Sequence, residues 1–277
     1  MYKRIIARLD IKNNTLVKGV SLEGLRVLGD PQYFSKQYFK NGIDEIHFQD
    51  VVATLYNRNS LDEVIESTVK NVFVTISAGG AIRNIEDINK VLRLGADKVT
   101  INSAAVRNPE FIKEASEEYG SSTIAVSIET ILSDDNNYYV LIESGREKTN
   151  VELFSFIEKI QKLGAGEIIL TSIQHEGRRK GFNIDLYKKI KKLISVPLVS
   201  HGGAGTVEDI VEVFQEADVD AVSLASLLHY SYMKKNNKIS EQGNMIFSQN
   251  YKNDTSQNLT INDIKKKLLE KNINIRK

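Results

Sequence analysis

The sequence predicts one α/β domain over residues 1–277, a single (βα)₈ TIM barrel with a two-fold half-barrel repeat. Three observations predict this fold class. A length of 277 residues is usual for one such barrel. Short runs rich in Val and Ile alternate with amphipathic stretches, and the second half of the chain repeats the first. An open, doubly wound sheet is the alternative, but the repeat favours closure, because two half-barrels cover each other's open edges.

The predicted strands are rich in Val and Ile and do not alternate cleanly between apolar and polar residues. This pattern is typical of strands that are buried on both faces. Eight runs fit it: residues 4–10, 45–50, 73–77, 98–102, 123–129, 167–172, 197–201 and 220–225. Helical patterns lie between them and cover residues 84–93, 108–118, 152–163, 184–193 and 207–216.

Two stretches mark the ends of helices. Asn84 has the character of an N-cap, and Gly95 ends the same helix. Near the C-terminus, the polar residues 234–258 are interpreted as an insert, either a surface excursion or a disordered segment. Thr260 and Asp263 then have the spacing of a capping box, which predicts a last helix that runs to about Lys271.

The internal repeat covers strands three and four of each half. Residues 77–81 match residues 200–204 at an offset of 123, and residues 96–100 match residues 219–223 at the same offset. At the ends of strands one and five, Asp10 corresponds to Glu129 at an offset of 119. The repeating unit is therefore a half-barrel of four βα units rather than a short solenoid repeat.

Composition excludes several classes of function. A net charge of +1 gives no overall field that would call for nucleic acid or a membrane as a partner. The chain has no cysteine, which excludes disulfides, thiolate metal sites and a cysteine nucleophile. No run of about 18 apolar residues exists, and the N-terminus lacks the apolar core of a signal peptide. We expect a cytoplasmic protein.

Two glycine-rich elements predict a phosphate site in each half of the barrel. Backbone N–H groups of glycine loops can approach an anion closely, and a helix N-terminus adds positive dipole. The alternative is that the glycines only allow tight turns. The first element comprises Gly79, Gly80 and Ala81 with Asn102 and Ser103, and the second comprises Gly202 and Gly203 with Ala225 and Ser226. The pair predicts a substrate with a phosphate at each end.

Charged residues at the strand ends predict the reaction centre. Asp10 and Glu129 end strands one and five, on opposite sides of the mouth, where two carboxylates can divide general acid and general base work. Lys18, in the first βα loop, is expected to hold a phosphate or to close as a lid. The alternative is that Lys18 or Arg146 forms a structural ion pair with one of the carboxylates. Further residues assigned to the mouth are Asp50, Thr171, Glu176 and Gly177.

A second charged set lies where strands begin. Arg4, Glu45, Lys98 and Glu167 open strands one, two, four and six, so they are expected to form a balanced ring across the barrel bottom. From spacing alone, a structural plug is the favoured interpretation. Histidines are scattered without the spacing of a metal site, so we expect neither a metal nor a cofactor.

From Met1 to about Tyr230, and again in the last helix, the chain resembles the cyclase subunit of imidazole glycerol phosphate synthase. The segments that carry the resemblance are KRIIARLD, LVKG, GDP, GIDEIHFQD, GADKVTINSAAVRNP, GAGEIILTSI and GGAG. The resemblance implies an ammonia-dependent lyase of histidine biosynthesis. Such an enzyme converts a bisphosphorylated, open-chain ribulosyl aminoimidazole nucleotide to imidazole glycerol phosphate and an aminoimidazole carboxamide ribonucleotide.

The resemblance also implies a partner. In this family a glutaminase subunit docks on the barrel bottom and supplies ammonia, which makes Arg4, Glu45, Lys98 and Glu167 a charged gate instead of a plug. Asp97 corresponds to a position at the contact with that subunit. The implied assembly is a heterodimer.

The departures from the family cluster at the mouth. The second catalytic aspartate is Glu129, and the residue before Leu9, usually cysteine, is Arg8. Other changes at the mouth are Gln49, Val52, Ala81, Glu176 and His201. Paralogues with altered mouths occur in surface-glycan pathways, where the barrel passes ammonia to a sugar amidotransferase. That role is the second interpretation of this chain, and another barrel lyase or isomerase is the third.

Overall fold

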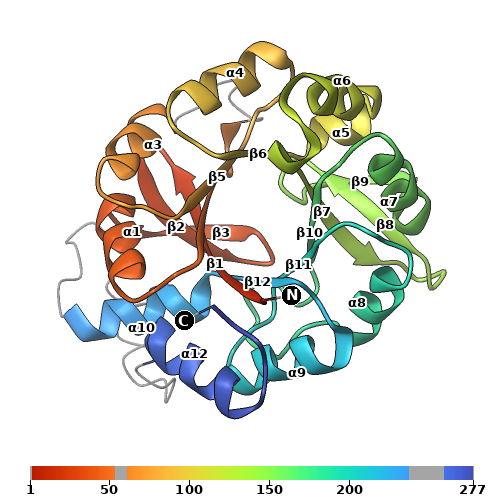
Figure 1. The fold of residues 1–277 in the computed structure, drawn as a ribbon. Helices are drawn as coiled ribbons and strands as arrows, with labels where there is room; N and C mark the ends of the chain where they lie inside the picture. The colour runs from red at the N-terminus through yellow and green to blue at the C-terminus, as the bar shows by residue number, and fades with distance from the viewer. Residues whose placement is uncertain (1, 54–60, 237–258, 277) are drawn as a thin grey trace.

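The computed structural model describes residues 2–53, 61–236 and 259–276, and in this part of the chain eight parallel strands close into a barrel. Figure 1 looks down its axis. Around the ring the strands are β1 (Arg4–Lys12), β4 (Glu45–Asp50), β5 (Thr75–Gly79), β6 (Lys98–Ile101), β7 (Ile124–Leu132), β10 (Glu167–Ser172), β11 (Leu198–His201) and β12 (Ala221–Leu224). The parallel pairing of β12 with β1, and of β7 with β10, closes the ring. The predicted barrel is confirmed, and the open sheet is excluded.

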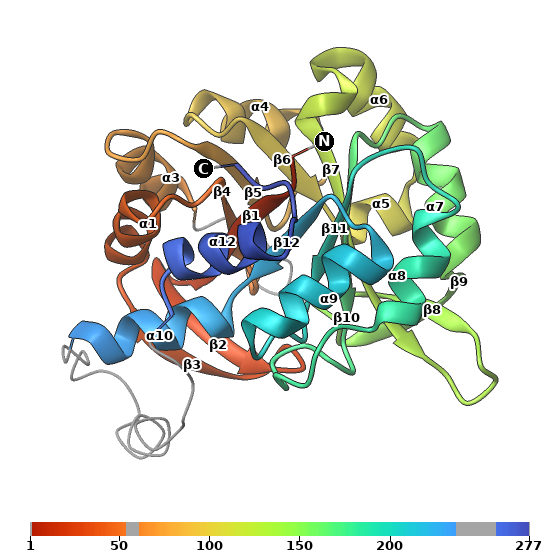
Figure 2. The same cartoon turned by 60° about the horizontal axis from the view of Figure 1, so that its bottom comes forward.

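The helices surround the ring, as Figures 1 and 2 show. They are α1 (Pro31–Lys40), α3 (Asp62–Val69), α4 (Ile85–Arg93), α5 (Ser103–Arg107), α6 (Glu110–Tyr119), α7 (Leu153–Lys162), α8 (Ile184–Lys191), α9 (Val207–Ala217), α10 (Ser226–Asn236) and α12 (Ile261–Glu270), with a 3₁₀ turn at Ser121–Thr123. Asn84 caps α4, and Thr260 with Asp263 forms the expected capping box of α12. No helix among the described residues is long and apolar enough to cross a membrane.

Several predicted segments differ from the structure. Strand β5 begins two residues later than expected, and Phe73 before it is 76% exposed. The helix expected over residues 108–118 is α6, which starts two residues later, after Pro109; the short helix α5 before it was not predicted. Helix α10 includes residues 234–236, the first three of the predicted polar insert; its other residues, 237–258, lie outside the described residues, so the insert stays a prediction.

Two antiparallel hairpins on the mouth side were not predicted. Strand β1 pairs with β2 (Thr15–Val20), which pairs with β3 (Glu23–Gly29). In the second half, β7 pairs with β8 (Tyr138–Ile142), which pairs with β9 (Glu147–Glu152). The hairpins lengthen β1 and β7 beyond Asp10 and Glu129, and they extend the internal repeat to the first strand of each half.

The barrel interior holds an apolar layer between its two ends. It consists of Ile6, Ala125, Ile169, Val199 and Ala221, which form a cluster separate from the large core between strands and helices. Because side chains alternate along each strand, residues two positions further on from Ile6 and Ile169 point inward at the next level, toward the mouth. The layer therefore separates a polar floor from a polar mouth.

Candidate functional site

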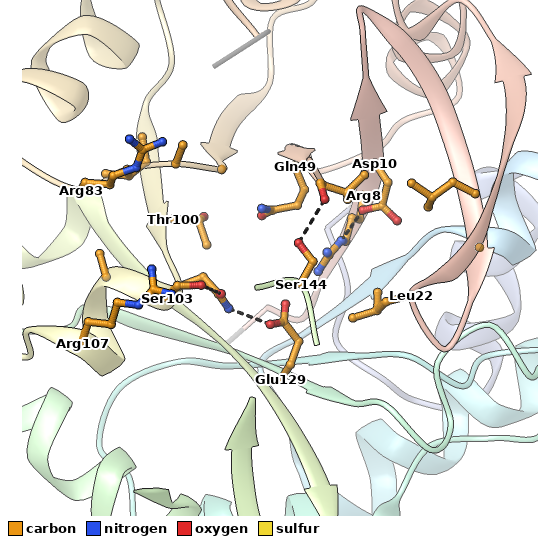
Figure 3. A pocket seen from close by; sticks show the side chains of 18 of the residues that line it. Arg8, Asp10, Leu22, Gln49, Arg83, Thr100, Ser103, Arg107, Glu129 and Ser144 are labelled. Atoms are coloured by element: carbon orange, nitrogen blue, oxygen red, sulfur yellow. Dashed lines mark hydrogen bonds and ion pairs between the residues drawn. The ribbon is translucent and has the colours of Figure 1, made fainter. Parts of the chain in front are cut away.

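A cavity of about 220 Å³ opens at the mouth, at the carboxyl ends of the strands. Figure 3 shows part of its lining, with Arg8 and Asp10 on one side and Glu129 on the other. The cavity brings together seven of the residues predicted for the mouth: Asp10, Lys18, Gly80, Ala81, Asn102, Ser103 and Glu129. In TIM barrels this end of the strands carries the active site.

Asp10 is buried in an ion-pair chain. Its Oδ1 accepts a hydrogen bond of 2.9 Å from Nε of Arg8, and its Oδ2 lies 4.0 Å from Nζ of Lys18. Burial by itself raises the pKa of a carboxyl group, but the charges of Arg8 and Lys18 outweigh it and lower the pKa of Asp10 to about 2. Asp10 is therefore ionised across the physiological pH range.

Glu129 lies in a different environment although it is equally buried. Its Oε2 accepts a hydrogen bond of 3.0 Å from the amide Nδ2 of Asn102, which also donates to the backbone oxygen of Ser127. Burial raises the pKa of Glu129 to about 7, and the more distant charge of Arg8 and the Asn102 hydrogen bond offset this only in part. Near neutral pH, Glu129 can therefore both hold and release a proton.

Lys18 is not in a loop, as predicted, but in strand β2. Its ammonium group forms an ion pair with Oε1 of Glu176, and the side chain is 1% exposed. Oε2 of Glu176 accepts a hydrogen bond of 2.9 Å from the backbone N–H of Leu22 at the tip of the hairpin. Glu176 thus ties the β2–β3 hairpin to the segment after β10. The structural alternative for Lys18 was an ion pair with a carboxylate, and its main partner is Glu176.

Arg146, the other cation considered as a structural partner of the carboxylates, lies elsewhere. Its Nη1 donates to the backbone oxygen of Glu143 at 3.4 Å. Arg8, a departure from the family at the residue before Leu9, forms an ion pair with Asp10 that the sequence analysis did not predict. The strand pattern could have indicated that pair, since residues two apart on a strand point to the same side.

Close packing alone explains why glycine is needed in the turns after β5 and β11. A Cβ on Gly80 would lie 2.7 Å from Cβ of Asp50, and one on Gly203 would lie 2.1 Å from the backbone oxygen of Gly181. Gly79 and Gly202 are similarly close to Gln49 and Glu176. The tight-turn interpretation thus accounts for these glycines, and the two phosphate sites stay a prediction.

The serines of the two predicted phosphate sites stand at helix starts. Ser103 begins α5 and Ser226 begins α10, as a phosphate site would need.

The other predicted mouth residues are placed as follows. Oδ1 of Asp50 accepts from the N–H of Val52 at 3.0 Å, which shapes the loop after β4. Thr171 is fully buried in β10, and its hydroxyl has no hydrogen-bond partner among the described residues. Gly177 packs against the hairpin, since a Cβ there would lie 2.9 Å from Cα of Val20. Ala225 is buried just after β12.

The predicted ring at the barrel bottom forms. Nη1 of Arg4 is 2.8 Å from Glu45, and its Nη2 is paired with Glu167. Nζ of Lys98 lies 3.3 Å from Glu45 and 3.2 Å from Glu167, so each cation bridges both anions. Burial raises the pKa of Glu45, and the neighbouring charge of Glu167 adds to this rise. The geometry is that of a closed, balanced charge ring.

Asp97 lies at the same end, beside the ring. Its Oδ2 accepts a hydrogen bond of 2.8 Å from the backbone N–H of Ile76, and it borders a surface groove that includes the exposed Phe73. Figure 2 shows both chain termini near this end of the barrel.

The described residues hold no cluster of three or more potential metal ligands among His, Asp and Glu. The buried histidines are neutral for a physical reason. Burial, together with the charge of Arg8, lowers the pKa of His47 to about 3 and that of His201 well below its ordinary value. Nδ1 of His201 donates to the backbone oxygen of Ser223 at 2.8 Å.

Comparison with known proteins gives the family. The model of the family described as "Histidine biosynthesis protein" matches residues 4–234. The imidazole glycerol phosphate synthase subunit HisF of Legionella pneumophila is 44% identical over 206 residues, which cover 74% of this chain and 97% of that protein. The HisF subunit of Bacillus cereus strain Q1 is 38% identical over 274 residues, or 99% of this chain and 98% of that protein.

A third relative agrees. The HisF subunit of Natranaerobius thermophilus is 39% identical over 244 residues, or 87% of this chain and 97% of that protein. These matches span nearly the whole of each relative, and the residues that the family model matches include all eight barrel strands. The chain therefore belongs to the HisF family, the cyclase subunits of imidazole glycerol phosphate synthase in histidine biosynthesis.

Proposed function

We propose that this chain uses ammonia to convert a bisphosphorylated, open-chain ribulosyl aminoimidazole nucleotide to imidazole glycerol phosphate and an aminoimidazole carboxamide ribonucleotide. The observation that carries the proposal is the pair of buried carboxyl groups, Asp10 and Glu129, on opposite sides of one cavity and with pKa values of about 2 and about 7. One carboxyl is ionised and the other can hold a proton, which is the division of roles that acid–base catalysis needs.

The first step follows from the chemistry of an open-chain ribulosyl group, which carries a ketone. The ammonia lone pair forms a C–N bond with the carbonyl carbon, and the π electrons of the C=O bond move to oxygen. Glu129 gives its proton to that oxygen, and Asp10 takes a proton from the new ammonium nitrogen. The product is a neutral carbinolamine, which loses water before the ring closes.

Phosphate binding belongs to the same proposal. The segments Gly79–Ala81 and Gly202–Gly203, with Ser103 and Ser226 at the starts of α5 and α10, would each hold one phosphate. A crystal soaked in inorganic phosphate tests this. Two occupied positions at the mouth are expected, and a single one would contradict a bisphosphorylated substrate.

The ring at the barrel bottom supports a partner that supplies ammonia. We assign Arg4, Glu45, Lys98 and Glu167 to a gate for ammonia and Asp97 to the contact with a glutaminase subunit. A balanced ring of ion pairs can open without leaving a net charge in the barrel floor. Co-purification with a glutaminase, and stimulation of its glutamine hydrolysis, would test this assignment.

The deciding experiment is turnover of the bisphosphorylated substrate by the purified chain, with an ammonium salt at alkaline pH and no glutaminase. Ring closure is expected, since free ammonia bypasses the partner. A folded chain that binds the substrate but does not convert it would contradict the cyclase.

One observation favours a second function. Arg8 ties up one oxygen of Asp10, which the cyclase needs, while the ring at the bottom is complete. This combination suits a barrel that relays ammonia from a glutaminase to a sugar amidotransferase of surface-glycan synthesis. Substrate binding without turnover, together with stimulation of a glutaminase, would support that function.

A further inference from the structure

Arg8 is a buried cation inside the reaction centre that the acid–base step does not use. Its side chain is 2% exposed, and it belongs to the cavity lining. Figure 3 shows its guanidinium group between Asp10 and Glu129. Nε is occupied by Asp10, but Nη1 has no hydrogen-bond partner among the described residues.

A buried donor without an acceptor is costly. Leaving a charged group's N–H unpaired in the interior lowers the stability of the fold, so native proteins usually supply water or a ligand there. Thr100 also lines the cavity and has a buried hydroxyl without a partner among the described residues. Arg8 and Thr100 both line the cavity, so a ligand oxygen that enters it meets residues with hydrogen-bond donors to spare, and Arg8 carries a full positive charge.

The position of Arg8 suits an oxygen that lies between the two carboxyl groups. The guanidinium group contacts Asp10 at 2.9 Å and lies on the side that faces Glu129 (Figure 3), and its charge lowers the pKa of both carboxyl groups. Arginine does not lose its proton in proteins, and its planar fork can donate in two directions at once. One direction is used for Asp10, which leaves the other donors of the fork for a ligand oxygen in the cavity that Arg8 lines.

We propose that Arg8 is a catalytic residue of this chain: a terminal N–H of its guanidinium group donates a hydrogen bond to the ketone oxygen at which ammonia adds, and stabilises the negative charge that this oxygen gains. The assignment rests on the proposed cyclase. In the addition step the C=O π electrons move onto that oxygen, Arg8 holds the resulting alkoxide, and Glu129 then delivers its proton. Arg8 itself gains and loses no proton, so the protons still move only from Glu129 to the oxygen and from the nitrogen to Asp10.

The simpler role for Arg8 is that of a counterion for Asp10. That role needs a positive charge near Asp10 but no second donor toward the substrate. Lysine keeps the charge and lacks the planar fork, while cysteine removes both. The two substitutions therefore separate a counterion from a substrate contact.

The experiment compares Arg8→Cys and Arg8→Lys with the unchanged chain and with Arg93→Cys. Arg93 is exposed at the end of α4, far from the mouth, so this variant controls for introducing a cysteine into a chain that has none. Binding of the bisphosphorylated substrate is measured by calorimetry without ammonia, where no turnover occurs. Turnover is then measured with saturating ammonium salt, under reducing conditions.

Arg8→Cys is expected to lower kcat about 10²–10³-fold, the usual effect of removing one oxyanion donor, while the Kd changes less than about threefold. Arg8→Lys should lose at least about tenfold in kcat, and Arg93→Cys should change neither quantity. Thermal unfolding checks that each variant is folded. Should Arg8→Cys not fold, Arg8→Gln removes the charge, keeps a polar group, and is expected to show the same loss in kcat.

Three results would overturn the assignment. Full turnover by Arg8→Lys would mean that a counterion is enough. Equal or faster turnover by Arg8→Cys would mean that Arg8 obstructs the centre. In both cases the cyclase itself stands. If the unchanged chain neither binds nor converts the substrate, the proposed function fails, and the role of Arg8 fails with it.

Discussion

The two halves of the barrel share one backbone plan, but they shift the pKa values of their equivalent carboxyl groups in opposite directions. Asp10 and Glu129 occupy equivalent places on β1 and β7, and each faces the first strand of a hairpin, at Val17 and Leu141. Two residues before them, the equivalent positions are Arg8 and Ser127. One carboxyl therefore has a guanidinium beside it on its own strand, and the other has a neutral hydroxyl there.

The residues that follow the neighbouring strands differ in the opposite sense, because the hydrogen-bond donor there lies beside Glu129 and not beside Asp10. Asn102 follows β6 and donates an amide hydrogen bond to Glu129, whereas the equivalent residue after β12 is Ala225, which cannot donate one to Asp10. The result is one ionised carboxylate and one carboxyl group that titrates near neutral pH. A duplicated scaffold can thus supply two different catalytic groups through a few substitutions near equivalent positions.

The largest effect should come from Asp10→Asn. We expect turnover to fall at least about 10³-fold, because the ionised base is lost. The free energy of unfolding should also fall by about 3–5 kcal/mol, since Arg8 loses its buried counterion. Steady-state kinetics and urea unfolding measure both. Asp134→Asn, at an exposed turn after β7, is the control, and turnover of Asp10→Asn at the unchanged rate would rule out the assignment.

Glu129→Gln should remove a pH dependence of the unfolding free energy near neutral pH, where Asp10 stays ionised. The folded-state pKa of about 7 lies above the ordinary value of 4.5, so the protonated form stabilises the fold. This contribution is complete below pH 4.5 and is lost as pH rises through 7. The unfolding free energy of the unchanged chain should therefore fall, relative to the variant, by about 3 kcal/mol over that range.

Urea unfolding at pH 5, 6, 7 and 8 measures this difference. At a fixed concentration of free ammonia, the rate of the unchanged chain should also decline above pH 7, where the acid is lost, and Glu129→Gln should be slow at every pH. Parallel stability curves for the two proteins would show that Glu129 is ionised in the fold, and that the two halves are electrostatically alike.

Lys98→Met tests whether the floor acts independently of the mouth. The substitution leaves Glu45 and Glu167 with Arg4 as their shared partner, and should lower the unfolding free energy by roughly 1–3 kcal/mol. Turnover with ammonium salt should stay within about twofold, because the apolar layer around Ile169 separates the ring from the mouth. Lys113→Met, in an exposed pair on α6, is the control for removing a lysine. A large loss of ammonium-dependent turnover would mean that the two ends are coupled.

The smallest effect concerns Ala81 and its equivalent, Ala204. Ala81 has a positive φ of 53°, in the region that costs a residue with a Cβ about 1–2 kcal/mol, while Ala204 lies outside it. Ala81→Gly should raise the unfolding free energy by about 0.5–1 kcal/mol, and Ala204→Gly should lower it by a similar amount through the more flexible unfolded chain. Urea unfolding of both variants measures these two changes in the unfolding free energy. Changes of the same sign would contradict the conformational argument.

Much of the site was predictable, because strand ends can be recognised in the sequence. The positions of Asp10, Glu129 and the four residues of the bottom ring follow from the strand pattern, since every parallel strand presents its start at the floor and its end at the mouth. The hairpins were missed because β2 and β3 lie where the barrel pattern predicts only a βα connection, and Lys18 was misplaced for the same reason.

The sequence by itself determined the closed barrel, its duplication, its family and the residues that face each end. Hydrophobic pattern and repeat spacing are local properties, and they can be read without knowing which side chains meet. Only the tertiary structure decided which of the two carboxyl groups is ionised. That outcome depends on how Arg8 and Asn102 are placed around buried groups, where the absence of water makes each charge and hydrogen bond count for more.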